Sequence, residues 1–150
     1  MLKRTLSKKD TEKTPYLVWN AFIDLIAMED ERDLTEIQRH AQRAFRYESE
    51  VQNGGHGQYF DNQRLEDYSV VIASLYELGA HAHAAVLEKA VTLFFGKTSR
   101  PRGGDPGDTH DIPEQEIIGL DFSYGNIQPD MNHYLAEYLK QHRDEFIEIL

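Results

Sequence analysis

The stretch that decides how this chain folds is Glu50–Asn62, which reads EVQNGGHGQYFDN. Asparagine and glycine tolerate the left-handed backbone conformation that terminates helices, so the run Asn53–Gly55 predicts the end of a helix. The aromatic pair Tyr59 and Phe60 follows within a few residues and predicts a short helical turn anchored in the core. Each of these residue types has a local structural role, and none of them forms a catalytic signature.

Apolar residues recur at three- and four-residue spacings on both sides of this stretch, as they do in amphipathic helices. No segment alternates apolar and polar residues as a strand would over more than four positions. The predicted helices cover residues 15–28, 35–53, 65–78, 81–95 and 114–124, with a last helix from Pro129 toward the C-terminus. We therefore predict an all-α, single-domain bundle of five or six helices.

Two segments fall outside this helical pattern. Residues 1–14 contain five basic and two acidic side chains and no sustained periodicity, which predicts a flexible basic arm ahead of a single helical domain over 15–150. Residues 96–113 are dense in glycine, proline and charge, which predicts one long loop.

Composition restricts the classes of function. The chain has 150 residues, no cysteine, 40% hydrophobic residues and a net charge of −10, so disulfides and thiolate chemistry are excluded. The N-terminus has no apolar signal region and no run is long enough to span a membrane, so we expect a cytoplasmic protein. Residues 1–14 carry +3, which leaves −13 for the others, and Asp105–Glu137 contains eight carboxylates without a lysine or arginine. Such a surface repels nucleic acid and membranes and attracts basic proteins.

Histidine and aspartate residues raise the question of a metal site. His81 and His83 lie two residues apart, so on a helix they diverge by about 200° and cannot both face one ion. We expect His81 to begin a helix and His83 to be exposed. The remaining candidates lie in the predicted long loop, where we expect solvated turns rather than ligands: Asp105, Asp108, His110 and Asp111. We predict no metal, no cofactor and no catalytic residue.

The central motif carries a resemblance to a known family. In this chain the resemblance is carried by the pattern NGG-x-x-QYF-x-N, which follows Glu50-Val51. The pattern consists of Asn53, Gly54, Gly55, Gln58, Tyr59, Phe60 and Asn62. This pattern resembles a bacterial domain-of-unknown-function family that includes a DNA-mimic protein. The resemblance extends over about residues 37–148 and implies an all-helical fold. It also implies that the protein occupies the nucleic-acid site of a transcription factor. The family usually has phenylalanine where this chain has His56, which makes the site more polar.

A DNA mimic needs carboxylates on a rigid element at spacings comparable to those of phosphates. The predicted last helix places Asp130, Glu137 and Asp144 seven residues apart on nearly one face, with about 10.5 Å along the axis between one and the next. Glu148 would extend this stripe by a turn. The predicted partner-binding surface consists of Glu114, Glu116, Asp121, Asp130, Glu137, Asp144 and Glu148. For the NGG motif we favour a structural role, with Gln58 and Asn62 bonding exposed backbone groups.

Several hypotheses remain open at this point. The first is an acidic interaction domain, either a DNA mimic or an immunity-type protein that neutralises a basic toxin, and it is compatible with a homodimer. The second is a hydrolase or metal-dependent enzyme that uses His56, His81 or His110. The third is a small-ligand module in which His56, Gln58 and Tyr59 line a pocket at the NGG turn, and it requires that the turn leave a cavity there.

Overall fold

The computed structural model describes residues 1–96 and 112–150. Their order is β1 (Arg4–Leu6), α1 (Lys8–Lys13), α2 (Tyr16–Met28), a 3-10 turn η1 (Glu31–Asp33), α3 (Glu36–Asn62), α4 (Tyr68–Glu77), α5 (His81–Phe95), α6 (Glu114–Gly125), α7 (Met131–Gln141), α8 (Arg143–Phe146) and β2 (Ile147–Ile149). The all-α prediction is confirmed: the described residues are 75% helical and contain almost no strand. The predicted loop lies mostly outside the described residues.

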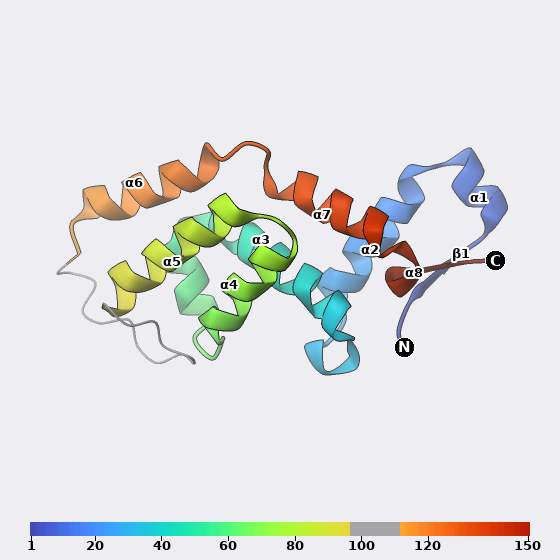
Figure 1. Cartoon of the computed structure of the whole chain (residues 1–150), viewed down its shortest axis with the longest axis horizontal. Coiled ribbons are helices and arrows are strands. Elements are labelled where there is room, and N and C mark those ends of the chain that lie inside the picture. The colour runs from blue at the N-terminus through green and yellow to red at the C-terminus, as the bar shows by residue number, and fades with distance from the viewer. Residues whose placement is uncertain (97–111) are drawn as a thin grey trace.

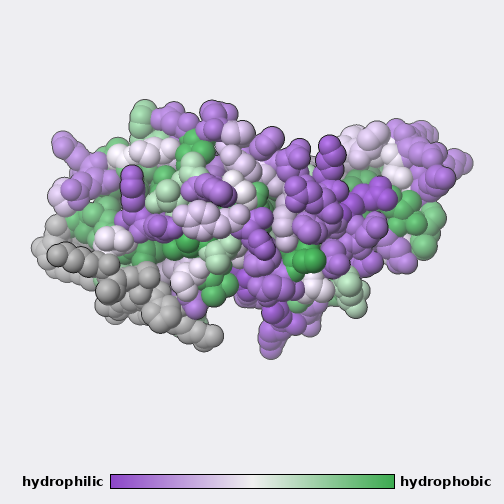
Figure 2. Space-filling model, viewed as in Figure 1, coloured by the Kyte–Doolittle hydropathy of each residue, from purple (hydrophilic) through white to green (hydrophobic). Residues whose placement is uncertain are grey.

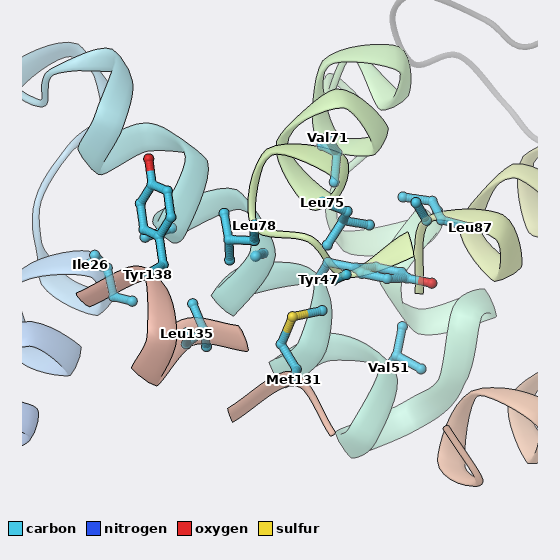
Figure 3. Packing of buried hydrophobic residues seen from close by; sticks show 14 of the residues in the cluster. Ile26, Tyr47, Val51, Val71, Leu75, Leu78, Leu87, Met131, Leu135 and Tyr138 are labelled. Carbon is cyan, nitrogen blue, oxygen red and sulfur yellow. The ribbon is translucent and has the colours of Figure 1, made fainter. Parts of the chain in front are cut away.

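Helix α3 is the central element, since it packs against α2, α4, α6, α7 and α8. It begins at a capping box in which Thr35 accepts from the Gln38 backbone N–H, while the Gln38 side chain accepts from the Thr35 N–H. Side chains from α2, α3, α4, α5 and α7 meet over it in one apolar core, as Figure 3 shows for Ile26, Tyr47, Leu75, Leu87 and Leu135, among others. The core thereby fixes the position of every helix around α3.

The molecule is elongated, and its two ends differ (Figure 1). At one end, both termini meet in a two-stranded parallel sheet with Arg4 opposite Ile147 and Leu6 opposite Ile149. At the other end lie α5 and α6. Helices α6 and α7 follow one another along a single long edge of the molecule, joined by a short connection. No helix within 1–96 or 112–150 combines the length and apolar character of a membrane span.

The N-terminal segment corrects one expectation. Residues 1–14 were expected to lack regular structure, yet they contain β1 and α1. The reason is non-local, because β1 forms its ladder with β2 at the far end of the sequence. Arg4 adds ion pairs to Asp24 (2.8 Å) and Glu29 (2.9 Å), which attach the segment to α2 and the residue that follows it. A three-residue strand has no local signature, so sequence periodicity could not reveal it.

The C-terminal segment corrects a second expectation, that of one continuous last helix. Helix α7 ends at Gln141, His142 has φ −125° and ψ 27°, and α8 is a separate four-residue helix that gives way to β2. Extended backbone from Ile147 onward satisfies its hydrogen bonds with β1 instead of with a preceding helical turn. The seven-residue spacing of carboxylates therefore does not correspond to one helix face.

Candidate protein-interaction surface

The NGG run bends α3 as its composition predicts. Gly54 has φ −152° and ψ 16°, and Gly55 has φ 77° and ψ −177°, so the helix is interrupted and then resumes as far as Asn62. The Gly55 conformation belongs to a region that is essentially open to glycine alone. A Cβ at Gly55 would also collide with the Asp121 carboxylate. Backbone conformation and close packing both require glycine at this position.

A single carboxylate joins the two halves of the bent helix. Glu50 lies before the glycines, and its Oε2 accepts hydrogen bonds from Gln58 Nε2 (3.0 Å) and Asn62 Nδ2 (2.8 Å), which lie after them. The expectation that Gln58 and Asn62 bond backbone groups is therefore wrong, apart from a long 3.5 Å contact between Gln58 and the Glu50 carbonyl. A charged acceptor strengthens both bonds.

The side chains of the motif fill the space around the bend. Tyr59 and Phe60 are both 1% exposed, which confirms their predicted place in the core. The Tyr59 ring packs edge-on against Tyr47 and also contacts Tyr68. The Gln58 side chain lies over Gly54, where a Cβ would collide with it. These contacts favour the structural role of the motif over a ligand-binding cavity at Gln58 and Tyr59.

His56 is held between α3 and α6. Its ring has no exposed surface and lies 2.6 Å from the Tyr47 hydroxyl through Nε2 and 2.7 Å from Asp121 Oδ1 through Nδ1. The His56 backbone N–H also donates to Asp121 Oδ1 at 3.0 Å. Because an ionised carboxylate only accepts, Nδ1 carries the proton that faces Asp121. Burial acts to raise the pKa of Asp121, but the hydrogen bonds from His56 outweigh it and lower that pKa.

This Asp121–His56–Tyr47 arrangement has the donor order of an acid–base relay, but its histidine and tyrosine are buried. His56 and Tyr47 are both 0% exposed, and burial raises the pKa of the Tyr47 hydroxyl well above its ordinary value. A general base must come within hydrogen-bond reach of the group that it deprotonates. The geometry therefore makes these three residues a structural tether between α3 and α6.

A second histidine is also buried beneath α6 and α7. His83 is 1% exposed, which corrects the expectation that it faces solvent. Its ring packs edge-on against Tyr124 of α6 and Tyr134 of α7, and burial lowers the pKa of its imidazole. His81 is exposed and packs edge-on against Tyr76, so the two histidines have different surroundings. Within the described ranges 1–96 and 112–150, no three metal-ligating side chains gather. The aspartates at 105, 108 and 111 and His110 lie outside those ranges.

The predicted acidic residues divide into two groups in the structure. Glu114 and Glu116 are exposed in the first turn of α6, where carboxylates favour the positive end of the helix dipole. Asp130 caps α7 through its Oδ1 and remains exposed, as does Glu137 within α7. We call these four carboxylates the acidic edge. In the described part of the chain, Glu114, Glu116 and Glu137 have no ion-pair partner.

The other three members of the predicted surface lie elsewhere. Asp121 points toward α3 and is engaged by His56, so it contributes little free charge to the outside. Asp144 lies on α8, 94% exposed but 3.8 Å from Arg143. Glu148 lies on β2 opposite Thr5. Sequence reasoning missed the inward-facing role of Asp121, because its partner His56 is 65 residues away.

A family model described as DMP19-like protein matches residues 32–142. The chain belongs to the DMP19-like family. DMP19 proteins are a family of DNA mimics, so the resemblance seen in the sequence is confirmed. The DMP19 match begins at η1 and includes the bent α3, the His56–Asp121 tether and the acidic edge, while β1, α1, α2 and β2 lie outside it. Searches of curated proteins and of solved structures gave no match.

Proposed function

We propose that this protein is an acidic interaction domain that acts as a DNA mimic, occupying the nucleic-acid site of a basic DNA-binding protein such as a transcription factor. The observation that carries the proposal is the acidic edge. It lies within the family-matched residues, and no lysine or arginine occurs on α6 or on α7 before Lys140. An edge of one sign attracts a basic groove and repels nucleic acid.

The dimensions of this edge suit a duplex-binding partner. At 1.5 Å per residue, α6 and α7 are each about 17 Å long, and they follow one another along one edge (Figure 1). The sum of their axial lengths, about 34 Å, is comparable with the 34–36 Å of one turn of B-DNA. The edge is anchored on its inner side by His56 and Tyr124, so its carboxylates are held on rigid helices rather than on a loop.

The number of charges is small compared with that of DNA. A duplex presents one negative charge per roughly 1.7 Å of axis, about twenty over such a length, whereas the acidic edge has four carboxylates. Charge of this density steers a basic partner and selects against acidic ones, but it supplies modest affinity by itself. The mimic therefore competes with DNA for the site through the positions of its carboxylates along the edge as well as through their charge.

The proposal can be tested by displacement of labelled duplex DNA from a panel of bacterial DNA-binding proteins. A variant with Glu114→Gln, Glu116→Gln, Asp130→Asn and Glu137→Gln removes the acidic edge. A matched control with Asp10→Asn, Glu12→Gln, Asp33→Asn and Asp61→Asn removes as many exposed carboxylates elsewhere. Both variants change the net charge from −10 to −6.

We expect the wild-type protein to displace DNA from at least one member of the panel. The edge variant should do so about 10-fold or more weakly at low salt, with a flatter dependence on salt, because exposed charge pairs contribute up to about 1 kcal/mol each and are screened. The control should remain close to wild type. No displacement by the wild type from any panel member, or equal loss in both variants, would contradict mimicry by this edge.

A further inference from the structure

Helix α6 has apolar side chains on its outer face as well as on its inner face. Ile117, Leu120 and Tyr124 pack against the core, whereas Ile118 and Phe122 are 58% and 71% exposed. Residues four apart on a helix lie about 40° from each other and one turn along the axis, so Ile118 and Phe122 form one continuous strip. We call this pair the apolar ledge. Figure 2 shows hydrophobic atoms among hydrophilic ones along this edge of the molecule.

One carboxylate of the acidic edge, Glu114, adjoins the apolar ledge. Glu114 lies one turn before Ile118 on the same row of the helix, and Glu116 lies on the opposite flank, about 160° away. Gly119 lies beside the ledge, and a Cβ there would have no atom within 4 Å. A glycine inside a helix costs about 0.5–1 kcal/mol relative to alanine, and here neither a positive φ nor a close contact requires it. An open helix backbone next to two apolar side chains allows another surface to approach closely.

Isolated exposed apolar residues need no explanation, but this pair adjoins a carboxylate of the acidic edge, and specific interfaces commonly combine apolar and charged groups in this way. Interfaces place apolar anchors at the centre and polar or charged groups around them. The anchors govern dissociation, while the charges govern encounter and selectivity. The apolar ledge supplies the anchor, and the acidic edge, with Glu114 one turn from Ile118, supplies the charge.

The charges also decide what covers the ledge. A second copy of the chain packed on the apolar ledge through its own ledge would bring two copies of Glu114 together, and like charges across an interface are unfavourable. A surface that carries lysine or arginine around an exposed apolar side chain would match both the apolar ledge and the carboxylates of the acidic edge. The partner must therefore be apolar at its centre and basic around it.

We propose that Ile118 and Phe122, with Gly119 beside them, form the anchor of the partner-binding surface, and that the occupant is a basic protein surface with apolar side chains at its centre. This inference rests on the proposed function, because it adds an apolar anchor and a partner chemistry to the same edge. The apolar contact accounts for affinity that four carboxylates do not provide.

The test uses two synthetic helical peptides as probes, titrated against the full-length protein by calorimetry or fluorescence anisotropy. One peptide has a leucine stripe flanked by lysine and arginine, and the other has serine in place of each leucine. We expect the wild-type protein to bind the leucine peptide about 10-fold or more tightly than the serine peptide, as for a buried apolar anchor. This preference should persist at 0.5 M salt, where charge attraction is screened.

Variants locate the anchor. The pair Ile118→Ser and Phe122→Ser should abolish the preference for the leucine peptide, and Gly119→Gln should reduce it by obstructing close approach without straining the helix. The control pair Met28→Ser and Leu65→Ser replaces residues that are 72% and 85% exposed elsewhere, and should leave the preference unchanged. Circular dichroism and thermal unfolding confirm that each variant is folded.

Two results would overturn the anchor. One is an unchanged leucine preference in the Ile118 and Phe122 variant. The other is self-association of the wild type, seen by light scattering, that the same variant abolishes, because a second copy would then be the occupant. Failure of the proposed function looks different: the wild type displaces no DNA from any panel member, although the leucine preference at the ledge remains.

Discussion

The inner and outer faces of α6 both carry carboxylate and apolar side chains, and they differ in whether other parts of the chain contact those side chains. On the inner face, Asp121 accepts two hydrogen bonds from His56, and Tyr124 is buried against α3 and α5. On the outer face, Glu114 has no ion-pair partner in the described residues, and Phe122 is 71% exposed. A carboxylate with a histidine against it stabilises the fold, whereas a carboxylate without a partner remains free for another protein. The position around the helix, not the residue type, separates structure from interaction.

The largest effect expected from breaking the inner face is that of His56→Ala. The change removes a buried ring, leaves the Tyr47 hydroxyl and Asp121 without their partner, and creates a cavity. We expect a loss of about 3 kcal/mol in the free energy of unfolding, measured by chemical denaturation. His133→Ala, at an exposed histidine on α7, should change it by less than about 0.5 kcal/mol. A loss below about 1 kcal/mol at His56 would show that the tether is not important for stability.

The next effect concerns the backbone beneath the tether. Gly55→Ala places a side chain at φ 77° and against the Asp121 carboxylate, so we expect destabilisation by about 1–3 kcal/mol. Gly57→Ala is a close control, because it lies two residues away in the same motif and its Cβ would have no atom within 4 Å. Thermal unfolding of both variants gives the comparison. Equal stabilities would mean that the bend does not need glycine.

The smallest expected effect is a pH dependence of the free energy of unfolding that arises from His83, the second buried histidine. Burial lowers the pKa of His83 below 6.5, so the unfolded chain takes up a proton on acidification before the folded chain does. The contribution of neutral, buried His83 to stability is therefore fully present above pH 6.5 and decreases as the pH falls below that value. His40 acts in the same direction, since burial also lowers its pKa. Denaturation curves at pH 7.5 and pH 5 should show a smaller loss for His83→Phe than for wild type. An identical loss would assign the dependence to other groups.

Local patterns in the sequence predicted much of this structure. The predicted helices over 15–28, 81–95 and 114–124 agree with α2, α5 and α6 to within a residue or so, because the spacing of apolar side chains reports one helix at a time. The NGG run predicted the bend for the same local reason. The weak periodicity of α6 also has a physical cause, since Ile118 and Phe122 put apolar residues on the face that a purely structural helix would keep polar.

The errors share a different cause. The β1–β2 ladder, the break at His142 and the burial of His83 all depend on segments that are distant in the sequence. The predicted carboxylate stripe failed because spacing along a chain becomes spacing along an axis only while a helix continues. Asp121 was assigned to the outside because composition does not reveal which carboxylate has a histidine facing it.

The sequence by itself determined the helical class, the family, the bend at Gly54–Gly55 and the excess of negative charge, since each depends on residue type and on neighbours a few positions apart. Only the tertiary structure decided which charges are free. Packing of α6 on α3 places Asp121 against His56 and leaves Glu114, Glu116 and Phe122 exposed. Burial and ion pairing arise between segments, and a residue acquires them only when the chain has folded.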